Sequence, residues 1–103
     1  MKGYWLVMGK AIRDEAAQKA YGALWAPIAA KYGARLIANG GAAELKEARQ
    51  TRRVLIVEFP DLAAARACYD DPAYIAAREL AWKASSRELL IFEGAIPDTA
   101  QAG

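Results

Sequence analysis

The sequence predicts a single α+β domain with the element order β-α-β-β-α-β. Four short apolar segments have the length and alternation of strands, two alanine-rich segments carry apolar residues at helical spacing, and turn or capping residues separate them. At 103 residues, 55% of them hydrophobic, the chain is long enough for one domain with its own core. We place the domain at residues 1–95 and expect residues 96–103 to form a flexible C-terminal tail.

The central strand is the clearest of these elements. Residues 53–59 read Arg-Val-Leu-Ile-Val-Glu-Phe, with apolar side chains at both sets of alternating positions, which is typical of a strand buried on both faces. Pro60 ends the strand because proline has no N–H to donate to a strand ladder. Asp61 follows at the position of a helix N-cap, so we predict a helix directly after this strand.

The first helical segment runs from Asp14, which can act as an N-cap, to Gly33, which can act as a left-handed C-terminal cap. Between them, apolar residues recur every three or four positions along one face. Pro27 lies inside the segment, and a proline clashes with the carbonyl four residues before it. We therefore expect a kink or a break near residues 23–27.

The second helical segment begins after Asp61 and is expected to be interrupted. The pair Asp71-Pro72 combines a capping side chain with a proline at the first helical position, which is typical of a new helix. Ser85-Ser86 then ends this second helix before the last strand. The segment should therefore contain two helices.

The remaining strands are predicted at residues 4–8, 34–38 and 88–93. Asn39-Gly40-Gly41 indicates a turn or bulge, and residues 42–52 are polar and should form a hairpin excursion. This element order is the ferredoxin-like arrangement. Both β-α-β crossovers should be right-handed, so we expect a four-stranded antiparallel sheet with the helices on one face.

Helices on one face leave the other face of this sheet without cover. Val54 and Ile56 point to one side of the central strand, and Leu55, Val57 and Phe59 point to the other, toward the helices. If it stayed uncovered, this face would expose an apolar patch larger than soluble monomers usually tolerate. We therefore predict a homodimer paired sheet to sheet through the open face, as in a dimeric α/β barrel. The alternative is a monomer whose C-terminal tail folds across that face.

Composition excludes several classes of function. The 14 basic and 12 acidic residues are scattered, which argues against nucleic acid or a membrane surface as a partner. No apolar run approaches the ~20 residues of a membrane span, and Lys2-Gly3-Tyr4 does not open a signal peptide, so we expect a cytoplasmic protein.

Catalytic chemistry is restricted by two residue counts. Histidine is absent, which removes Ser-His-Asp and Cys-His catalysis, histidine-ligated haem and the usual zinc sites. Cys68 is the only cysteine, so no intrachain disulfide can form, and we expect it to be a buried structural thiol. We predict neither a metal nor a cofactor, and whether the protein is an enzyme stays open.

Glu58 is the candidate catalytic residue. By alternation it shares the open face with Val54 and Ile56, where a carboxylate is partly removed from water. It can act there as a general base or as a hydrogen-bond acceptor for a ligand. The alternative is a structural ion pair with Arg53, Arg35 or an arginine of a partner chain.

Glu93 is a candidate partner for Glu58 in an acid/base pair. We expect the central strand to run parallel to the first strand and the last strand to run antiparallel to it. The two glutamates would then lie at opposite ends of the sheet, beyond the ~5 to 9.5 Å of a hydrolytic carboxylate pair. The sequence therefore argues against a glycosidase.

Aromatic residues suggest a binding site for a small apolar or aromatic metabolite between the sheet and the helices. The candidate ligand-binding residues are Trp5, Trp25, Arg53, Tyr69 and Tyr74. The alternative is that the aromatic residues only fill core space that so many alanines leave. The protein can thus be a small enzyme that uses Glu58, or a non-catalytic metabolite-binding or regulatory dimer.

Several short motifs together resemble a known family. They are Tyr4-Trp5, Lys31-Tyr32-Gly33, Asn39-Gly40-Gly41, Arg53 with Val57-Glu58-Phe59-Pro60, and Tyr69 with Asp71-Pro72-Ala73-Tyr74. Over roughly residues 3–95 the chain resembles family 1330 of the domains of unknown function, which is similar to the dimeric α/β-barrel superfamily. That resemblance implies two ferredoxin-like chains paired through their sheets. Members of the wider superfamily include cofactor-free monooxygenases, isomerases and haem enzymes, so the fold does not select a reaction.

Overall fold

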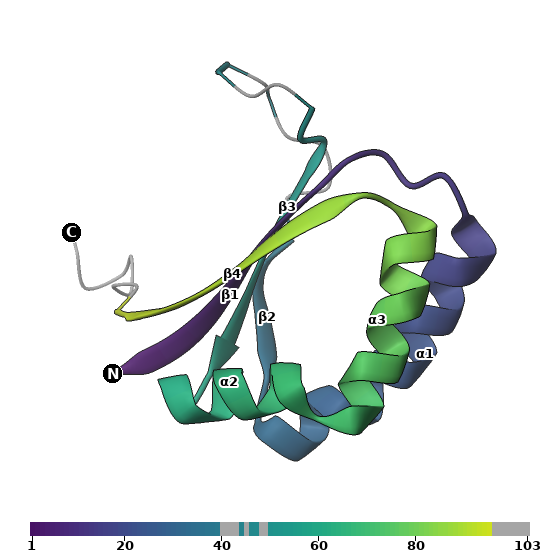
Figure 1. The fold of residues 1–103 in the computed structure, drawn as a ribbon. Helices are drawn as coiled ribbons and strands as arrows, with labels where there is room; N and C mark the ends of the chain where they lie inside the picture. The colour runs from purple at the N-terminus through teal and green to yellow at the C-terminus, as the bar shows by residue number, and fades with distance from the viewer. Residues whose placement is uncertain (40–43, 45, 48–49, 96–103) are drawn as a thin grey trace.

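The computed structural model describes residues 1–39, 44, 46–47 and 50–95, which form one sheet and three helices (Figure 1). In chain order the elements are β1 (Lys2–Gly9), α1 (Glu15–Tyr32), β2 (Arg35–Asn39), β3 (Arg53–Phe59), α2 (Leu62–Asp70), α3 (Pro72–Ala84) and β4 (Arg87–Gly94). This is the predicted order, and the second helical segment is divided at Asp71-Pro72 as expected.

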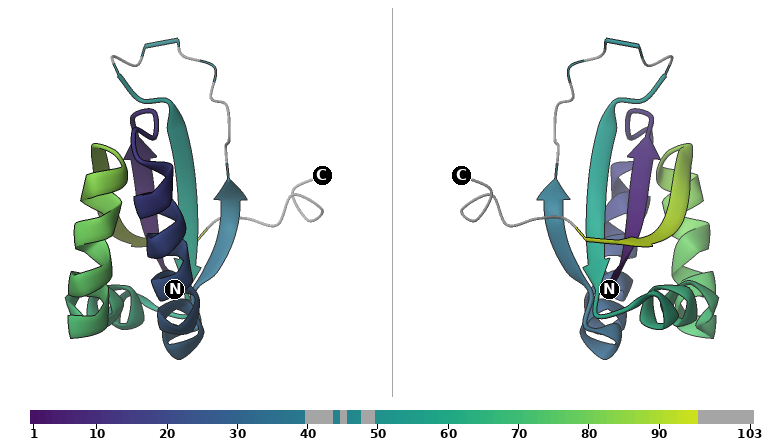
Figure 2. Two further views of the ribbon diagram at one scale, coloured as in Figure 1. Left: turned by 90° about the vertical axis from the view of Figure 1, so that its right-hand side faces the viewer. Right: turned by 90° about the vertical axis from the view of Figure 1, so that its left-hand side faces the viewer.

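The four strands form an antiparallel sheet in the order β2-β3-β1-β4. β1 is central and pairs with β3 on one side and with β4 on the other. The three helices lie against one face of the sheet, and the two views of Figure 2 show the helices in front of the strands and then behind them. The predicted fold class, a ferredoxin-like α+β sheet with helices on one face, is therefore confirmed.

The two faces of the sheet have the predicted contents. Leu55, Val57 and Phe59 belong to the core between sheet and helices. Val54 and Ile56 alternate with them and pair with Met8 and Leu6 of β1, which places these four on the open face. On the same face, two large side chains of β4 are exposed, Leu90 at 50% and Phe92 at 40%.

The last strand runs antiparallel to the first, as expected, but the expectation that the central strand runs parallel to the first is wrong. β3 runs antiparallel to β1, because it lies between β1 and β2, which a helical crossover connects in the same direction. Glu58 pairs with Tyr4, and Glu93 pairs with Gly3, so the two glutamates lie toward the same end of the sheet. Side chains of consecutive residues point to opposite faces, so Glu58 and Glu93 are separated by the sheet itself. They do not form a carboxylate pair.

Each helix begins at an aspartate whose side chain accepts a hydrogen bond from a backbone N–H, as predicted. The acceptor and donor residues are Asp14 and Ala17 at 3.0 Å, Asp61 and Ala64 at 2.7 Å, and Asp71 and Ala73 at 2.8 Å. Gly33 ends α1 with a φ of 65°, the left-handed conformation that glycine adopts without a Cβ penalty.

Pro27 does not break the helix. α1 continues through it over 18 residues, so the expected break is absent. A proline removes one backbone N–H and crowds the preceding turn, which a helix held by tertiary packing can tolerate. Trp25 before the proline and Ile28 after it both pack against the same core, and these contacts hold the two halves of α1 together.

The core is built around Trp5. Its side chain is 1% exposed, and its indole Nε1–H donates to the carbonyl of Ala65 at 3.0 Å. The rings around it belong to Trp25, Phe59, Tyr69 and Tyr74, with centroids 5.0 to 5.8 Å from that of Trp5.

Cys68 lies in α2 and is fully buried, as predicted for a structural thiol. Burial, together with the nearby charge of Asp71, raises the pKa of this thiol to about 12. The thiolate is therefore not formed near neutral pH, and Cys68 is not an activated nucleophile.

Three expectations fall mainly on residues outside the described part of the chain. They are the turn at Asn39-Gly40-Gly41, of which only Asn39 is described, the hairpin excursion at residues 42–52, and the tail at 96–103. None of the described helices is long and apolar enough to cross a membrane. The cytoplasmic location stays a prediction.

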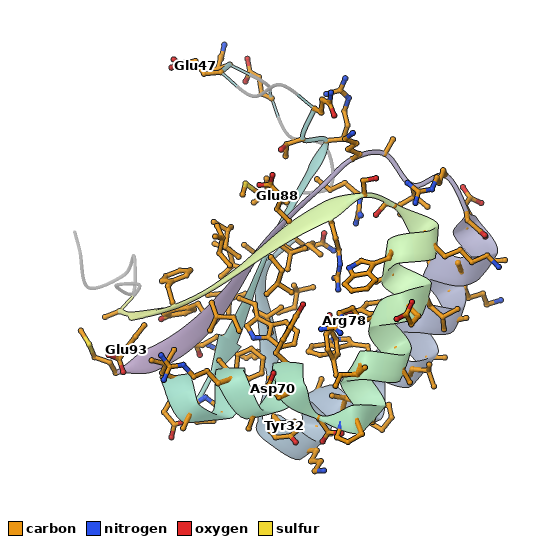
Figure 3. The ribbon with its side chains drawn as sticks, in the orientation of Figure 1. Tyr32, Glu47, Asp70, Arg78, Glu88 and Glu93 are labelled. Carbon is orange, nitrogen blue, oxygen red and sulfur yellow. The ribbon has the colours of Figure 1, made fainter. Side chains whose placement is uncertain are left out.

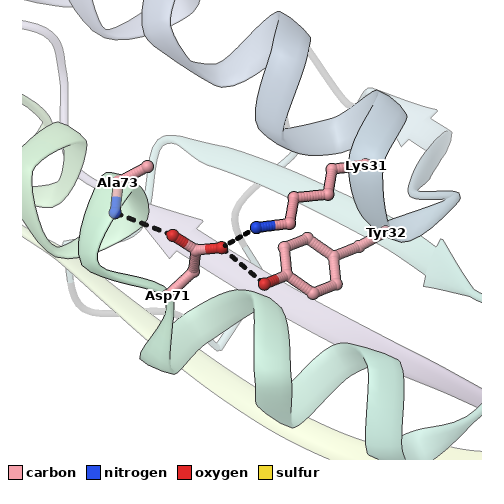
Figure 4. A network of polar contacts seen from close by, with 4 residues as sticks. All are labelled: Lys31, Tyr32, Asp71 and Ala73. Carbon is pink, nitrogen blue, oxygen red and sulfur yellow. Dashed lines mark hydrogen bonds and ion pairs between the residues drawn. The ribbon is translucent and has the colours of Figure 1, made fainter.

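Asp71 connects the end of α1 to the start of α3 (Figure 4). Besides capping α3, its carboxylate accepts hydrogen bonds from the Tyr32 hydroxyl and from the Lys31 ammonium, the latter at 2.9 Å. The hydrogen bond from Tyr32, followed by those from Lys31 and Ala73, lowers the pKa of Asp71 from 3.8 to about 2. Asp71 is therefore ionised in the folded protein across the physiological range.

The depressed pKa of Asp71 predicts a specific loss of stability in acid. Between about pH 4 and pH 2 the unfolded chain binds this proton more readily than the folded chain, so the free energy of unfolding falls as the pH falls. Asp71→Asn keeps a capping oxygen but removes the charge. We expect this variant to be less stable at neutral pH and to lose less stability between about pH 5 and pH 2, measured by urea denaturation. Parallel pH profiles for the two proteins would contradict this.

Candidate functional site

A cavity of about 400 Å3 lies between the sheet and helices α1 and α3. Its apolar walls come from the helix-facing residues of the strands and from one face of each helix. The sheet contributes Trp5, Val7, Leu36, Leu55 and Val57, and the helices contribute Tyr21, Gly22, Trp25 and Ala81. Two of the helix residues that line this space, Gly22 and Ala81, have little or no side chain.

The polar part of the cavity lies near the end of β1, which is flanked by the start of β3 on one side and the start of β4 on the other. Its polar side chains are Gln18, Asn39, Arg53, Ser85 and Arg87. Arg53 begins β3 and Arg87 begins β4, and both pair with Gly9 at the end of β1. The sheet register thus places two arginines on the same face, one on each side of a glycine.

Arg87 is held by two tyrosines. Its Nη2 donates to the Tyr74 hydroxyl at 2.6 Å, and its Cζ lies 5.4 Å from the centroid of the Tyr21 ring. The hydroxyls of Tyr21 and Tyr74 are 3.0 Å apart and hydrogen-bonded. Burial, together with the neighbouring Tyr21, raises the pKa of Tyr74 well above its ordinary value, so its hydroxyl stays protonated. The Nε of Arg87 is buried and has no hydrogen-bond partner among the described residues.

Arg53 is held by neutral groups as well. Its Nη2 donates to Ser85 Oγ at 2.9 Å, and its Nε donates to the carbonyl of Lys10 at 3.3 Å. Ser85 is 1% exposed and follows the last turn of α3. Burial, followed by the positive charge of Arg87, lowers the pKa of Arg53. The two guanidinium groups therefore repel one another across the cavity.

The structure brings together most of the predicted ligand-binding residues. Trp5, Trp25 and Arg53 line the cavity. Tyr74 is fully buried and does not line the cavity itself. Its hydroxyl is hydrogen-bonded to Tyr21 and Arg87, which do line it. Tyr69 packs against Trp5 and Tyr74 in the core, where it does not line the cavity.

Glu58 lies apart from this group. It pairs with Tyr4 on the open face of the sheet, whereas the cavity lies on the helix side. Its carboxylate forms an ion pair with Arg35 of β2 at 3.2 Å and lies 4.0 Å from the ammonium of Lys2. Of the partners considered from the sequence, Arg35 makes this contact, and Arg53 points into the cavity instead. Within one chain, Glu58 does not reach a ligand held in the cavity.

Other carboxylates of the sheet also lie away from the cavity. Glu88 pairs with Met8 and lies on the side of β4 that faces away from the helices (Figure 3). Arg78 of α3, labelled in the same view, stacks on Tyr69 and Trp82 with its Cζ 5.0 and 4.7 Å from their ring centroids. In the described ranges, no group of three or more cysteine, aspartate or glutamate residues is placed to hold a metal ion.

The fold and the cavity define a ferredoxin-like α+β chain with an open cavity between its sheet and its helices. Residues 2–95 match the model of the family described as Domain of unknown function (DUF1330), and the chain belongs to that family. No curated protein sequence matches the chain.

Solved structures with the same fold come from several bacteria. A protein of unknown function from Rhodopseudomonas palustris is 20% identical, with 93% of this chain and 84% of that one covered and a TM-score of 0.72. A dimeric ferredoxin-like protein of unknown function from Jannaschia sp. CCS1 is 17% identical, with 91% and 100% covered and a TM-score of 0.67.

An enzyme is also among the similar structures. SnoaB, a cofactor-independent oxygenase from Streptomyces nogalater, is 14% identical, with 93% of this chain and 95% of that one covered and a TM-score of 0.57. At these identities the likeness establishes the fold, and the function has to be argued from the cavity itself.

Proposed function

We propose that the protein binds a small apolar or aromatic metabolite in the cavity between its sheet and helices α1 and α3. The observation that carries this proposal is the cavity itself. Its volume of about 400 Å3 falls within the roughly 300 to 1,000 Å3 of small-molecule sites. Its walls combine indole, phenol and aliphatic surface with a few polar groups at one end, which is the usual composition of such sites.

We propose binding without catalysis by Glu58. A general base must lie within hydrogen-bond reach of the proton that it removes. Glu58 is on the opposite face of the sheet from the cavity and is paired with Arg35. This placement supports a structural ion pair at the sheet surface and favours the metabolite-binding role over an enzyme that uses Glu58.

We also infer that the functional unit is a homodimer that pairs through the open face of the sheet. Leu90 and Phe92 are exposed on that face beside the apolar side chains of β1 and β3. Burying such a surface against a second copy removes apolar area from water, at roughly 25 cal/mol for each Å2. The similar protein from Jannaschia is described as dimeric, which supports a dimer here.

Gly22 provides a test of binding in the cavity. It is an exposed residue of α1 that lines the cavity, and a Cβ added there meets no atom within 4 Å. Gly22→Phe should therefore fold while placing a ring in the cavity. We expect neutral 2-naphthol to bind the unmodified protein and to bind Gly22→Phe at least about tenfold more weakly, in a calorimetric titration.

Gly22→Ala is the matched control for this experiment. Alanine leaves the cavity open, and in a helix interior it should raise the free energy of unfolding by about 0.5 to 1 kcal/mol. We expect its affinity for 2-naphthol to equal that of the unmodified protein. Equal binding by the phenylalanine and alanine variants would contradict the proposed site, and no binding by the unmodified protein would contradict the proposed function.

A further inference from the structure

We propose that the polar end of the cavity is an anion site and that the ligand is a compact aromatic or aliphatic carboxylate. Its carboxylate group would lie between Arg53 and Arg87, and its hydrocarbon part would lie against Trp5 and Trp25. The inference rests on the proposed function, because it assigns a charged group to the metabolite that the cavity binds.

Gly9 is what brings the two arginines to one place. It pairs with Arg53 on one side and with Arg87 on the other, so their Cα atoms are two strand spacings apart, about 9.6 Å. The guanidinium of Arg53 lies over Gly9, because a Cβ added to Gly9 would be 2.7 Å from its Nη2 and 3.3 Å from its Cζ. A side chain at this position would push Arg53 away, and glycine lets it extend toward Arg87.

The two guanidinium groups have no anionic partner among the described residues. The ion pairs among the described residues involve other basic side chains. The hydrogen-bond acceptors of Arg53 and Arg87 are a serine hydroxyl, a main-chain carbonyl and a tyrosine hydroxyl. Partly buried charges are costly when they lack a counterion. The buried Nε of Arg87 also lacks an acceptor. An anion between the arginines would satisfy the remaining donors and relieve the repulsion between the two charges.

A carboxylate fits this site better than a phosphate. One N–H of Nη2 in each arginine donates to the protein, to Ser85 or to Tyr74, and the two oxygens of a carboxylate need fewer of the remaining N–H donors than a tetrahedral phosphate does. Guanidinium groups form bidentate contacts with carboxylates and with phosphates alike, so the surroundings of the arginines decide between the two anions. The apolar walls begin directly beside these donors, with Trp5, Tyr21 and Trp25 lining the same cavity. Such an arrangement suits one charged end joined to a flat hydrocarbon body.

Two probes of the same shape test the inference. 2-Naphthoate carries the carboxylate, and 2-naphthamide replaces it with a neutral amide. By isothermal titration calorimetry at low salt, we expect 2-naphthoate to bind at least about tenfold more tightly than 2-naphthamide. Equal affinities would overturn the anion site and leave the proposed function standing. A failure of both probes to bind would contradict the proposed function itself.

Variants identify the residues responsible. Arg53→Gln and Arg87→Gln should each weaken 2-naphthoate binding at least about tenfold and change 2-naphthamide binding less than about threefold. Arg52→Gln is the matched control, because it removes the same charge from the neighbouring residue, which is exposed and does not line the cavity. A similar loss in Arg52→Gln would show that only net charge matters and would overturn the site.

Gly9→Ala keeps the inference testable if an arginine variant does not fold. It retains both charges but displaces the Arg53 guanidinium, so 2-naphthoate binding should weaken while 2-naphthamide binding is retained. Unchanged 2-naphthoate affinity in a folded Gly9→Ala protein would overturn the assignment. Inorganic phosphate and benzoate, compared as competitors of 2-naphthoate, provide a last check. Displacement of 2-naphthoate by phosphate at lower concentrations than by benzoate would contradict a carboxylate site.

Discussion

Trp5→Ala is expected to lower the free energy of unfolding by about 3 to 5 kcal/mol, the range observed when buried aromatic residues are truncated. Trp5 is 1% exposed and packs against Trp25, Phe59 and Tyr74. The substitution also leaves the carbonyl of Ala65 without the indole donor at 3.0 Å. Urea denaturation followed by circular dichroism measures the loss, and ligand binding in the cavity should disappear with it.

Trp82→Ala is the control of the same residue type. Trp82 is 44% exposed and stacks on Arg78 at the outer side of α3. Its removal should cost less than about 1 kcal/mol, because an exposed cation–π contact contributes little. If the two tryptophan variants lost similar stability, Trp5 would not be the centre of the core.

Leu90→Glu is expected to convert a dimer into a monomer. Leu90 is 50% exposed on the open face of the sheet, and a charged side chain there would be buried without a partner in a sheet-to-sheet dimer. Sedimentation equilibrium should give twice the 11.2 kDa chain mass for the unmodified protein and the single-chain mass for the variant. The fold of the monomer should be retained, since the open face is not part of the core.

Leu24→Glu serves as the control for the dimer. Leu24 is 44% exposed, close to the exposure of Leu90, but it lies on α1 rather than on the sheet. It should leave the dimer intact. A single-chain mass for the unmodified protein at micromolar concentration would contradict the proposed dimer, and dissociation by Leu24→Glu alone would place the interface on the helices.

Local signals made most of the fold predictable. Apolar alternation located the strands, and aspartate caps at Asp14, Asp61 and Asp71 located the helix starts to within a residue. The effect of Pro27 was not predictable in this way, because contacts of Trp25 and Ile28 with distant residues keep the helix intact. Local propensity describes a segment alone, whereas tertiary packing decides marginal cases.

The candidate site was only partly predictable. Trp5, Trp25 and Arg53 were identified by residue type, but Tyr21 and Arg87 were missed. Arg87 stands one residue before the strand predicted at residues 88–93, and its importance depends on the register that places it opposite Gly9. An arginine at the start of each of two strands was the available signal, and it becomes informative only when both strands are known to flank the same residue of β1.

The role of Glu58 shows why residue type alone is insufficient. A carboxylate in an apolar strand suggested a catalytic base, and the sequence left a structural ion pair open as the alternative. The face of the sheet decides what Glu58 can contact, and the registers of β1 and β3 place it with Arg35, away from the cavity. The direction of β3, which was predicted wrongly, also determines that Glu58 lies toward the same end of the sheet as Glu93.

Backbone and indole amide signals recorded during a titration with 2-naphthoate test the binding site most directly. In a two-dimensional 1H–15N NMR experiment, we expect the largest shifts at the amides of Gly22 and Arg53 and at the indole N–H of Trp25, which line the cavity. Amides of Leu90 and Phe92 on the open face should move little. Shifts confined to the open face, or none at millimolar ligand, would contradict a ligand site between the sheet and the helices.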